Sequence, residues 1–498
     1  MKGKYLLLAV PLYLDPKLEP PLTSLLASTA LHRLVDGLGS PLNVVVPDRI
    51  ADNVARFQSV YRRHHLDGKI YFAHKANKST SLVRRLTTTG AAMDVASLNE
   101  LQHALACGFT PDRIGATGPK EPEFLWLAAR TGVTVNVEGP AELEDLASLV
   151  RRHGLPPVHV LLRLSDFSGP GARVLSRRSR FGSPASEFAG LLDAAERHGD
   201  ALEVVGVSYH LDTTSIEEKA RALEGCIRAM DGCRARGMRP RLIDMGGGFG
   251  VSYLADGAQW ERYTTQLTLA AMGKGQTMAW RDHSYGLRRE GNALRGSLEL
   301  YPSYRPIAGA EYLDELLRSP APTLGRPLAT LLLENLYDLC VEPGRALLDQ
   351  CGLTLARVLE TRTEPDGSHS LRLAMNADDC ALEEHGILMD PVLLRRDTSR
   401  RERTRPPEEG GGFYLHGNLC LESDLITRRI VYLPERPMPG DLLAFPNTAG
   451  YCMDFNAHHA QQQPVARKVA MYEGAGGWEW RLDEQYWPIH STGDAHEV

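Results

Sequence analysis

Short apolar runs that recur between about residues 70 and 345 are the feature that most constrains the fold of this chain. Most of them are continuous and rich in apolar or β-branched residues, which is typical of strands covered on both faces. Eight such runs can be assigned: YFAHKAN (71–77), AAMDVAS (91–97), RIGATGP (113–119), VTVNVEG (133–139), VHVLLRLS (158–165), VVGVSYH (204–210), RLIDMGGG (241–248) and YDLCVEPG (337–344).

The early gaps between these runs carry helical patterns. Residues 97–108, 122–132 and 141–154 repeat apolar side chains at helical spacing, and each segment ends on a glycine, as helices often do. Strand and helix alternating in this way is the building block of a parallel sheet, so eight units predict an α/β fold with a closed parallel (β/α)8 barrel of the TIM type. An open doubly wound sheet would satisfy the same pattern and remains the alternative.

The chain is expected to divide into three parts. Residues 1–45 form an arm or strand that joins a β domain, residues 46–345 form the barrel, and residues 346–498 form a C-terminal antiparallel β-sandwich or β-barrel. The segment from about 250 to 335 is too long for one crossover, and we interpret it as an insertion over the barrel mouth, helical in part. A surface excursion without a role in chemistry is the alternative. In the β domain, strands are expected at 353–363, 369–376, 412–420 and 428–435.

The net charge and the cysteines argue against several classes of protein. The net charge of −6 gives no basic surface for nucleic acid or for anionic membranes. The eight cysteines are scattered without a C-x-x-C pair, which indicates reduced thiols in a cytoplasmic protein and no metal site. The N-terminal run MKGKYLLLAVPLYL is short and interrupted by Pro11, so we expect an arm or strand rather than a signal peptide.

Side chains that can perform chemistry gather at the C-terminal ends of the expected strands, where parallel barrels carry their active sites. Taken singly, each has an ordinary explanation: a structural lysine or histidine, a tight glycine turn, or a surface ion pair. Their occurrence together at one end of most strands favours a site. They are Lys75, Asp94, Arg163, His210, Gly246, Gly247, Gly248, Glu342 and Arg345.

The residue types at these positions each allow a particular chemistry. A desolvated lysine such as Lys75 has a lowered pKa and can form a Schiff base with a carbonyl. Three glycines after a strand let backbone N–H groups approach a phosphate, although here neither nucleotide-binding motif is satisfied. Glu342 could keep a heterocyclic nitrogen protonated, Arg345 could bind a phosphate or carboxylate, and His210 could stack on a flat ring.

Taken in order, the segments resemble the fold-type III decarboxylases that depend on pyridoxal 5'-phosphate (PLP), a family that includes diaminopimelate, ornithine and arginine decarboxylases. The resemblance implies an alanine-racemase-like barrel and a homodimer whose active sites lie between two chains. The matching pieces, spread over roughly residues 40–460, are YFAHKANKS, MDVASLNEL, LLRLSD, SRFG, VSYHLDTTS, IDMGGGFG, CVEPGR, GNLCLESD and PGDLLAFPNTAGY.

The resemblance also implies a role for each matched residue. Lys75 would bind the cofactor aldehyde, His210 would stack on the ring, and Glu342 would pair with the ring nitrogen. Asp94 and Arg163 would support the lysine end of the site, and Cys420 of the partner subunit would reprotonate the product carbanion. The phosphate would be held by Gly246, Gly247, Gly248, Arg345, Tyr451 and Thr213, the last standing where the family often has serine.

The implied reaction is decarboxylation of an amino acid through an internal aldimine at Lys75 and a quinonoid intermediate. An acid at the ring nitrogen deepens the electron sink, whereas the related alanine racemases place an arginine there. Cys420, with help from Lys75, would protonate Cα. Racemisation or decarboxylation coupled to further chemistry on the same scaffold, and a non-catalytic PLP-binding regulator, are the alternatives.

Departures from the family pattern concern the substrate. After the matched cysteine, decarboxylases of basic amino acids and of diaminopimelate carry an acid that helps bind the distal ammonium, but here Leu421 stands there. The R-P-x-L-Y substrate motif of diaminopimelate decarboxylases has no counterpart near residues 375–391. We therefore expect a substrate other than standard diaminopimelate or ornithine, with Arg345, Glu422 and Asp424 as the candidates to bind it.

Overall fold

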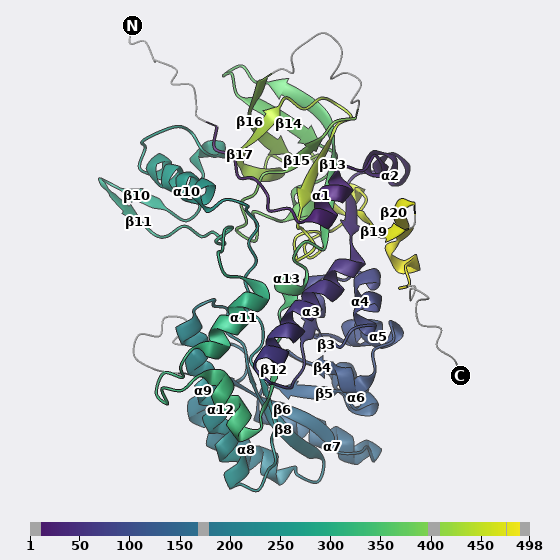
Figure 1. The fold of residues 1–498 in the computed structure, drawn as a ribbon, viewed down its shortest axis with the longest axis vertical. Helices are drawn as coiled ribbons and strands as arrows, with labels where there is room; N and C mark the ends of the chain where they lie inside the picture. The colour runs from purple at the N-terminus through teal and green to yellow at the C-terminus, as the bar shows by residue number, and fades with distance from the viewer. Residues whose placement is uncertain (1–10, 168–178, 397–408, 475, 489–498) are drawn as a thin grey trace. The chain divides into compact units, whose positions relative to one another are not determined.

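The computed structural model describes residues 11–167, 179–396, 409–474 and 476–488 (Figure 1). The chain divides into two compact units. One, the barrel unit, consists of Pro47–Gly250, Ile307–Leu347 and Glu484–Val498. The other, the β-rich unit, consists of Met1–Val46, Val251–Pro306 and Leu348–Asp483.

The barrel unit contains a sheet of eight parallel strands at the positions expected from sequence. The strands follow one another without a reversal, and a parallel bridge between Ile70 and Val341 links the first to the last. The sheet is therefore a nearly closed barrel, not an open doubly wound sheet. In chain order its strands are β2 (Tyr71–Ala73), β3 (Ala92–Val95), β4 (Ile114–Ala116), β5 (Thr134–Val137), β6 (Val158–Ser165), β8 (Leu202–Tyr209), β9 (Leu242–Asp244) and β12 (Asp338–Cys340), with the short β7 (Ser183–Pro184) beside β6.

Helices surround these strands (Figure 1). The three that the sequence predicts are present, and Gly132 and Gly154 end two of them in the left-handed conformation, at φ 78° and 57°. Ser97 caps the third by accepting a hydrogen bond from the backbone N–H of Glu100. The helices are α3 (Pro47–Arg63), α4 (Thr80–Thr87), α5 (Leu98–Ala106), α6 (Pro122–Thr131), α7 (Pro140–His153), α8 (Phe188–Arg197), α9 (Ile216–Ala235), α11 (Gly309–Arg318), α12 (Leu328–Asn335) and α13 (Gly344–Leu347).

The sheet of the β-rich unit is mixed, whereas the sequence predicted an antiparallel one. Most pairs are antiparallel, but β1 pairs with β19 and β14 pairs with β16 in parallel. Both parallel pairs join strands separated by long connections, which a hairpin turn cannot provide. The strands are β1 (Leu42–Val45), β13 (Gly352–Thr363), β14 (His369–Leu373), β15 (Val392–Leu394), β16 (Glu409–His416), β17 (Leu425–Glu435), β18 (Leu442–Pro446), β19 (Arg467–Gly474) and β20 (Gly477–Leu482).

The N-terminal segment contributes one strand and two helices to the β-rich unit. β1 lies between β13 and β19, and α1 (Pro20–Leu26) and α2 (Ala30–Leu38) pack their leucines on the same apolar core. Residues 1–10, on which the expectation about a signal peptide depends, lie outside the described residues. Among the helices that the structure describes, none is long and apolar enough to cross a bilayer.

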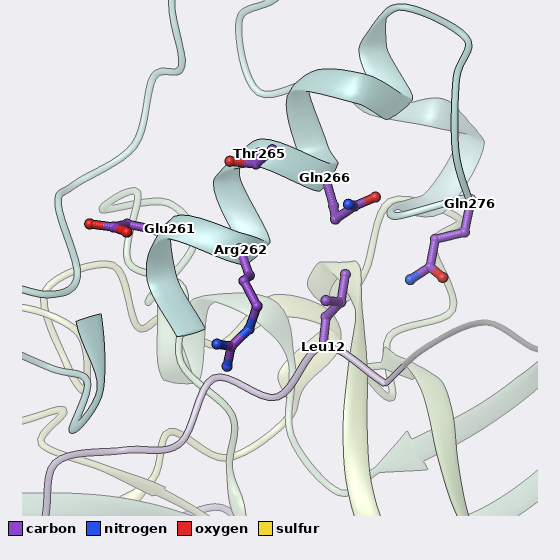
Figure 2. A pocket seen from close by; sticks show the side chains of 6 residues that line it. All are labelled: Leu12, Glu261, Arg262, Thr265, Gln266 and Gln276. Carbon is purple, nitrogen blue, oxygen red and sulfur yellow. The ribbon is translucent and has the colours of Figure 1, made fainter. Parts of the chain in front are cut away.

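The segment expected to be one insertion is divided between the two units. Val251–Pro306 belongs to the β-rich unit and carries α10 (Gly257–Ala271) and the hairpin of β10 (Arg288–Glu290) and β11 (Ala293–Arg295), whereas α11 and α12 pack in the barrel unit. Beside α10 lies a cavity of about 490 Å³. It is lined by Glu261, Arg262, Thr265 and Gln266 of the helix, by Leu12 of the N-terminal segment and by Gln276 (Figure 2).

Candidate active site

Lys75 lies directly beyond the C-terminal end of β2. The strand ends at Ala73, and Lys75 occupies the 3-10 turn His74–Ala76, where it is exposed between two buried neighbours. Lys75 is therefore exposed beyond the strand, whereas the sequence predicted a desolvated lysine. Burial raises the pKa of both Asp94 and Glu342, and the charge of Lys75 partly opposes that rise, so the ammonium lies within electrostatic reach of both carboxyls.

Three buried carboxyl groups come together at this end of the barrel: Asp94 on β3, Asp244 on β9, and Glu342 just after β12. Burial raises the pKa of each. The charge of Asp94 adds to the rise at Asp244, whose pKa reaches about 7, and the charges of Asp94 and Asp244 add to the rise at Glu342. Asp244 accepts a hydrogen bond from the Gly246 N–H at 2.9 Å and also shares one with Glu342. The Asp94 side chain forms a hydrogen bond with Thr117, but its Oδ1 atom is buried and has no hydrogen-bond partner.

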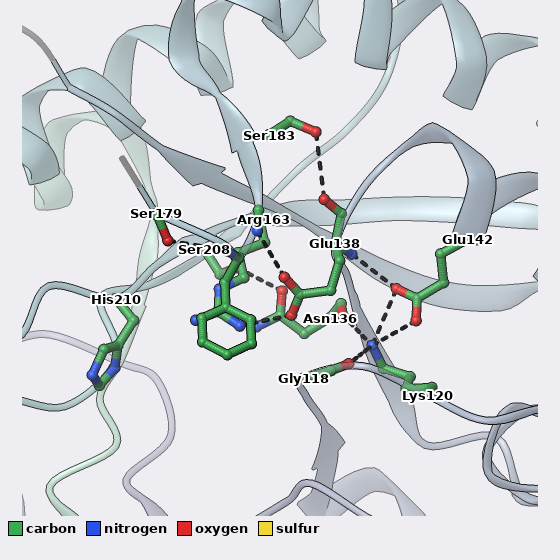
Figure 3. A network of polar contacts seen from close by, with 12 residues as sticks. Gly118, Lys120, Asn136, Glu138, Glu142, Arg163, Ser179, Ser183, Ser208 and His210 are labelled. Carbon is green, nitrogen blue, oxygen red and sulfur yellow. Dashed lines mark hydrogen bonds and ion pairs between the residues drawn. The ribbon is translucent and has the colours of Figure 1, made fainter. Parts of the chain in front are cut away.

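Arg163 on β6 is held by a carboxylate from the neighbouring strand end. Its Nη1 lies 2.7 Å from Glu138 Oε1, and the other oxygen of Glu138 accepts from the Gly182 N–H at 2.7 Å. Figure 3 shows Glu138 between Arg163 and a second pair formed by Lys120 and Glu142. The guanidinium is therefore fixed beside the carboxyl cluster, where its charge partly opposes the rise in the pKa of Glu342 that burial causes.

The loop that begins at His210 packs against the turn formed by Gly246–Gly248. The Gly247 N–H donates to His210 Nδ1 at 3.1 Å, and the same nitrogen lies 3.9 Å from Glu342 Oε2. Burial, followed by the charges of Lys219, Lys75 and Arg163, holds the pKa of His210 well below its usual value. A neutral imidazole is also what the Gly247 contact requires, because Nδ1 can accept a hydrogen bond only when it carries no proton.

The three glycines fill positions that no larger residue could occupy. A Cβ atom at Gly246 would lie 2.7 Å from the Tyr209 carbonyl oxygen, and one at Gly247 would lie 2.9 Å from that of Glu342. Gly246 and Gly248 also have positive φ angles of 63° and 83°. The turn therefore presents backbone without side chains, the surface that a phosphate group needs.

Comparison with known proteins agrees with this geometry. Residues 48–276 match the family model described as pyridoxal-dependent decarboxylase, pyridoxal binding domain. The chain is 31% identical over 447 residues to the uncharacterized protein y4yA of Sinorhizobium fredii, covering 88% of this chain and 89% of that protein. It is 24% identical to the diaminopimelate decarboxylase of Methanothermobacter thermautotrophicus, with 89% of both chains covered.

The chain belongs to the fold-type III PLP-dependent decarboxylase family. The crystal structure of Helicobacter pylori diaminopimelate decarboxylase complexed with L-lysine shares the fold, with a TM-score of 0.64 and 18% identity over 91% of this chain and 95% of that one.

The barrel residues fit the cofactor of this decarboxylase family. The glycine turn leaves room for a phosphate, and the orphaned oxygen of Asp94 marks a buried polar position that lacks its partner. Glu342 and Asp244 supply carboxyls able to face a protonated pyridine nitrogen, and Lys75 supplies the amine. Thr213 lies against the turn, since a Cβ atom at Gly248 would be 2.9 Å from the Thr213 carbonyl oxygen, and its hydroxyl donates to Glu218 at 2.8 Å. Thr213 and Arg345, which is half-buried on α13, remain predicted phosphate ligands.

The remaining predicted decarboxylase residues belong to the β-rich unit. Cys420 is exposed, and its backbone N–H donates to Gln461 Oε1 at 2.9 Å. Glu422 is 88% exposed and lies 3.4 Å from Arg281 Nη2. Both oxygens of Asp424 accept backbone N–H bonds, from Ala377 at 2.8 Å and Leu419 at 2.7 Å, so this carboxylate organises its own loop. Tyr451 has a positive φ of 71° and contacts the rings of His385 and Phe455.

Three residues of the decarboxylase barrel were missed by sequence reasoning: Glu138, Asp244 and Lys219. Asp244 stands two residues before the triple glycine in IDMGGG, and Glu138 is the next-to-last residue of the fourth strand run, so the sequence already placed both at strand ends. Lys219 has a different signal. It stands on the apolar face of α9, in helical register with Leu223, Cys226 and Met230, all fully buried.

Proposed function

We propose that this protein is a PLP-dependent decarboxylase of an amino acid. The observation that carries the proposal is the grouping of Lys75, the carboxyl cluster and the glycine turn at one end of the barrel. Bound PLP supplies an electron sink for the pair of electrons released when the bond from Cα to the carboxylate breaks. The protein supplies attachment, orientation and protons.

Each barrel residue would have one task. Lys75 Nζ would bind the cofactor aldehyde, and the ring of His210 would stack on the pyridine. Glu342 would hold a proton on the ring nitrogen, and its hydrogen bond to Asp244 keeps that carboxyl in place. Arg163, fixed by Glu138, holds positive charge near the acids. In this proposal the acid that favours decarboxylation over racemisation is Glu342, because it keeps the ring nitrogen positive.

The loop around Cys420 would complete the site from the partner subunit of a homodimer. Its thiol is exposed, as a group that delivers a proton to Cα of a molecule bound to another chain must be. The next residue, Leu421, is 57% exposed, and it stands where family members that act on basic amino acids carry an acid. We infer a substrate whose side chain has no distal ammonium group.

The test of the activity is a screen of L- and D-amino acids for CO₂ release by the purified protein loaded with PLP, with Lys75→Ala as control. The expected result is CO₂ release by the wild type and none above background by the variant. Borohydride reduction followed by peptide mass spectrometry should place the cofactor mass on Lys75. Exchange of the α-proton without CO₂ would show a racemase, and PLP binding with neither reaction would show a regulator.

The substrate class has its own test in the variant Leu421→Asp. If an acid at this position recruits a distal ammonium, the variant should gain kcat/KM on lysine or ornithine by about tenfold or more, the factor for ~1.4 kcal/mol. Leu421→Asn is the matched control, because it is similar in size and polarity but has no charge. Equal gains in both variants would show that charge at position 421 does not select the substrate.

A further inference from the structure

Lys219 is a buried cation with no role in the site as described so far. Its side chain is fully buried at the end of the first turn of α9. Lysine is among the residues least often buried, because removal of its ammonium from water is costly unless the charge is used. Burial lowers its pKa to about 8, so the group still carries its charge at neutral pH. A buried ammonium is stable only when a group of opposite charge, or a set of hydrogen-bond acceptors, lies beside it.

The ammonium lies directly against the glycine turn. Lys219 Nζ donates a hydrogen bond to the Gly247 carbonyl, and a Cβ atom at Gly248 would lie only 2.8 Å from the same nitrogen. The Phe249 ring centroid is 5.3 Å away. The lysine thus occupies the space beneath the turn that the absence of side chains leaves open.

This contact fixes the direction of the next N–H group. In a trans peptide the carbonyl and the following N–H point in opposite directions. Because the Gly247 carbonyl points toward Lys219, the Gly248 N–H points away from α9. The lysine therefore orients a donor of the turn outward and places a positive charge behind it, an arrangement that binds anions.

No carboxylate in the described part of the chain lies within ion-pair distance of Lys219. Asp212, exposed on the loop before α9, and Glu342 act on it only through longer-range attraction, which partly opposes the effect of burial. Glu342 itself favours its neutral form, since burial and the nearby Asp94 and Asp244 raise its pKa. The charge of Lys219 is therefore left for a ligand.

We infer that Lys219 is a positioning residue of a phosphate subsite: it holds the Gly246–Gly248 turn in its anion-binding form and attracts the phosphate dianion of the cofactor. The inference rests on the proposed use of PLP but not on decarboxylation. It adds to the subsite a cation that comes from helix α9, whereas the predicted phosphate ligands all come from loops and from α13.

The experiment compares PLP with pyridoxal, the same molecule without the phosphate, in isothermal titrations of the full-length cofactor-free protein. Lys219→Gln keeps an N–H donor for the Gly247 carbonyl but removes the charge, and Lys219→Met removes both. Lys274→Gln, at an exposed lysine, is the control for the change in net charge. Thermal unfolding without ligand shows whether each variant folds.

The expected result is that Lys219→Gln weakens PLP binding about tenfold or more while pyridoxal binding changes less than about twofold, and that Lys274→Gln changes neither. The ratio of the two affinities is measured within one variant, so partial loss of stability does not affect it. Equal weakening for both ligands would reduce Lys219 to a structural role and overturn the inference, as would unchanged PLP binding. If the wild-type protein binds PLP but releases no CO₂, the decarboxylase proposal is wrong, whereas the inference about Lys219 is unaffected.

Discussion

At the scale of single residues, the buried carboxyls determine how the barrel responds to pH. Burial raises the pKa of Asp244 to about 7, whereas an aspartate in the unfolded chain titrates near 3.9. Between these two values the folded protein binds more protons than the unfolded one. The stability that this group contributes is therefore complete below about pH 4 and is lost as the pH rises through 7.

Asp244→Asn should remove that part of the pH dependence. In urea unfolding of the cofactor-free protein at pH 5 and pH 8, we expect the wild type to lose more stability than the variant between the two conditions. Asp145→Asn, at an exposed aspartate on α7, is the matched control and should follow the wild type. If the Asp244→Asn profile runs parallel to that of the wild type, the carboxyl is not protonated in the folded state at pH 5.

The residues that could be predicted share a property. Lys75, His210 and Glu342 stand at the C-terminal ends of strands that the sequence reveals. In a parallel barrel these ends all lie at the face that carries the active site. Glu138 was passed over although it stands near the end of a strand run, because its importance lies in the partner that it finds, Arg163, 25 positions away. Lys219 was passed over because a helix face does not reveal that it packs against a glycine turn.

At the scale of elements, the barrel strands were predictable because burial on both faces makes each of them a continuous apolar run. β3 and β5 are buried at every position, so the strands are found as apolar runs without an alternation of apolar and polar residues. The strands of the β-rich unit could be located but not paired. β1 joins β13 and β19 from more than 300 positions away, and nothing in its four residues specifies those partners.

β17 carries a buried ion cluster that gives an element-scale prediction. Arg429 is fully buried, with Nη1 2.6 Å from Asp390 Oδ1 and its Nε 3.7 Å from Glu383. Arg429→Met would leave these carboxyls buried without their cation and should cost about 3–5 kcal/mol of unfolding free energy. Arg428→Met, at the neighbouring side chain that is 46% exposed, should change stability by no more than about 0.5 kcal/mol. Equal losses, measured by urea unfolding, would show that the cluster is not what holds this strand.

At the scale of the whole molecule, the β-rich unit exposes large apolar side chains that bear on the proposed homodimer. Leu421 and Phe455 are 57% and 52% exposed, and Phe455 stacks edge-on against Tyr451, a predicted phosphate ligand. Large apolar groups exposed beside a polar loop are typical of protein interfaces. This placement supports the proposal that Cys420 acts in the active site of a partner subunit.

Subunit complementation tests that proposal directly. Lys75→Ala and Cys420→Ala should each be nearly inactive as homodimers. When the two are mixed and allowed to exchange subunits, half of the dimers should be mixed, and each mixed dimer has one site with both residues intact. About one quarter of the wild-type activity should therefore return, as expected for a two-fold symmetric dimer with shared sites. Mixing either variant with fresh copies of itself is the control. If size-exclusion chromatography shows mixed dimers and no activity returns, Lys75 and Cys420 do not meet across subunits, because a shared site cannot fail to form in half of the population.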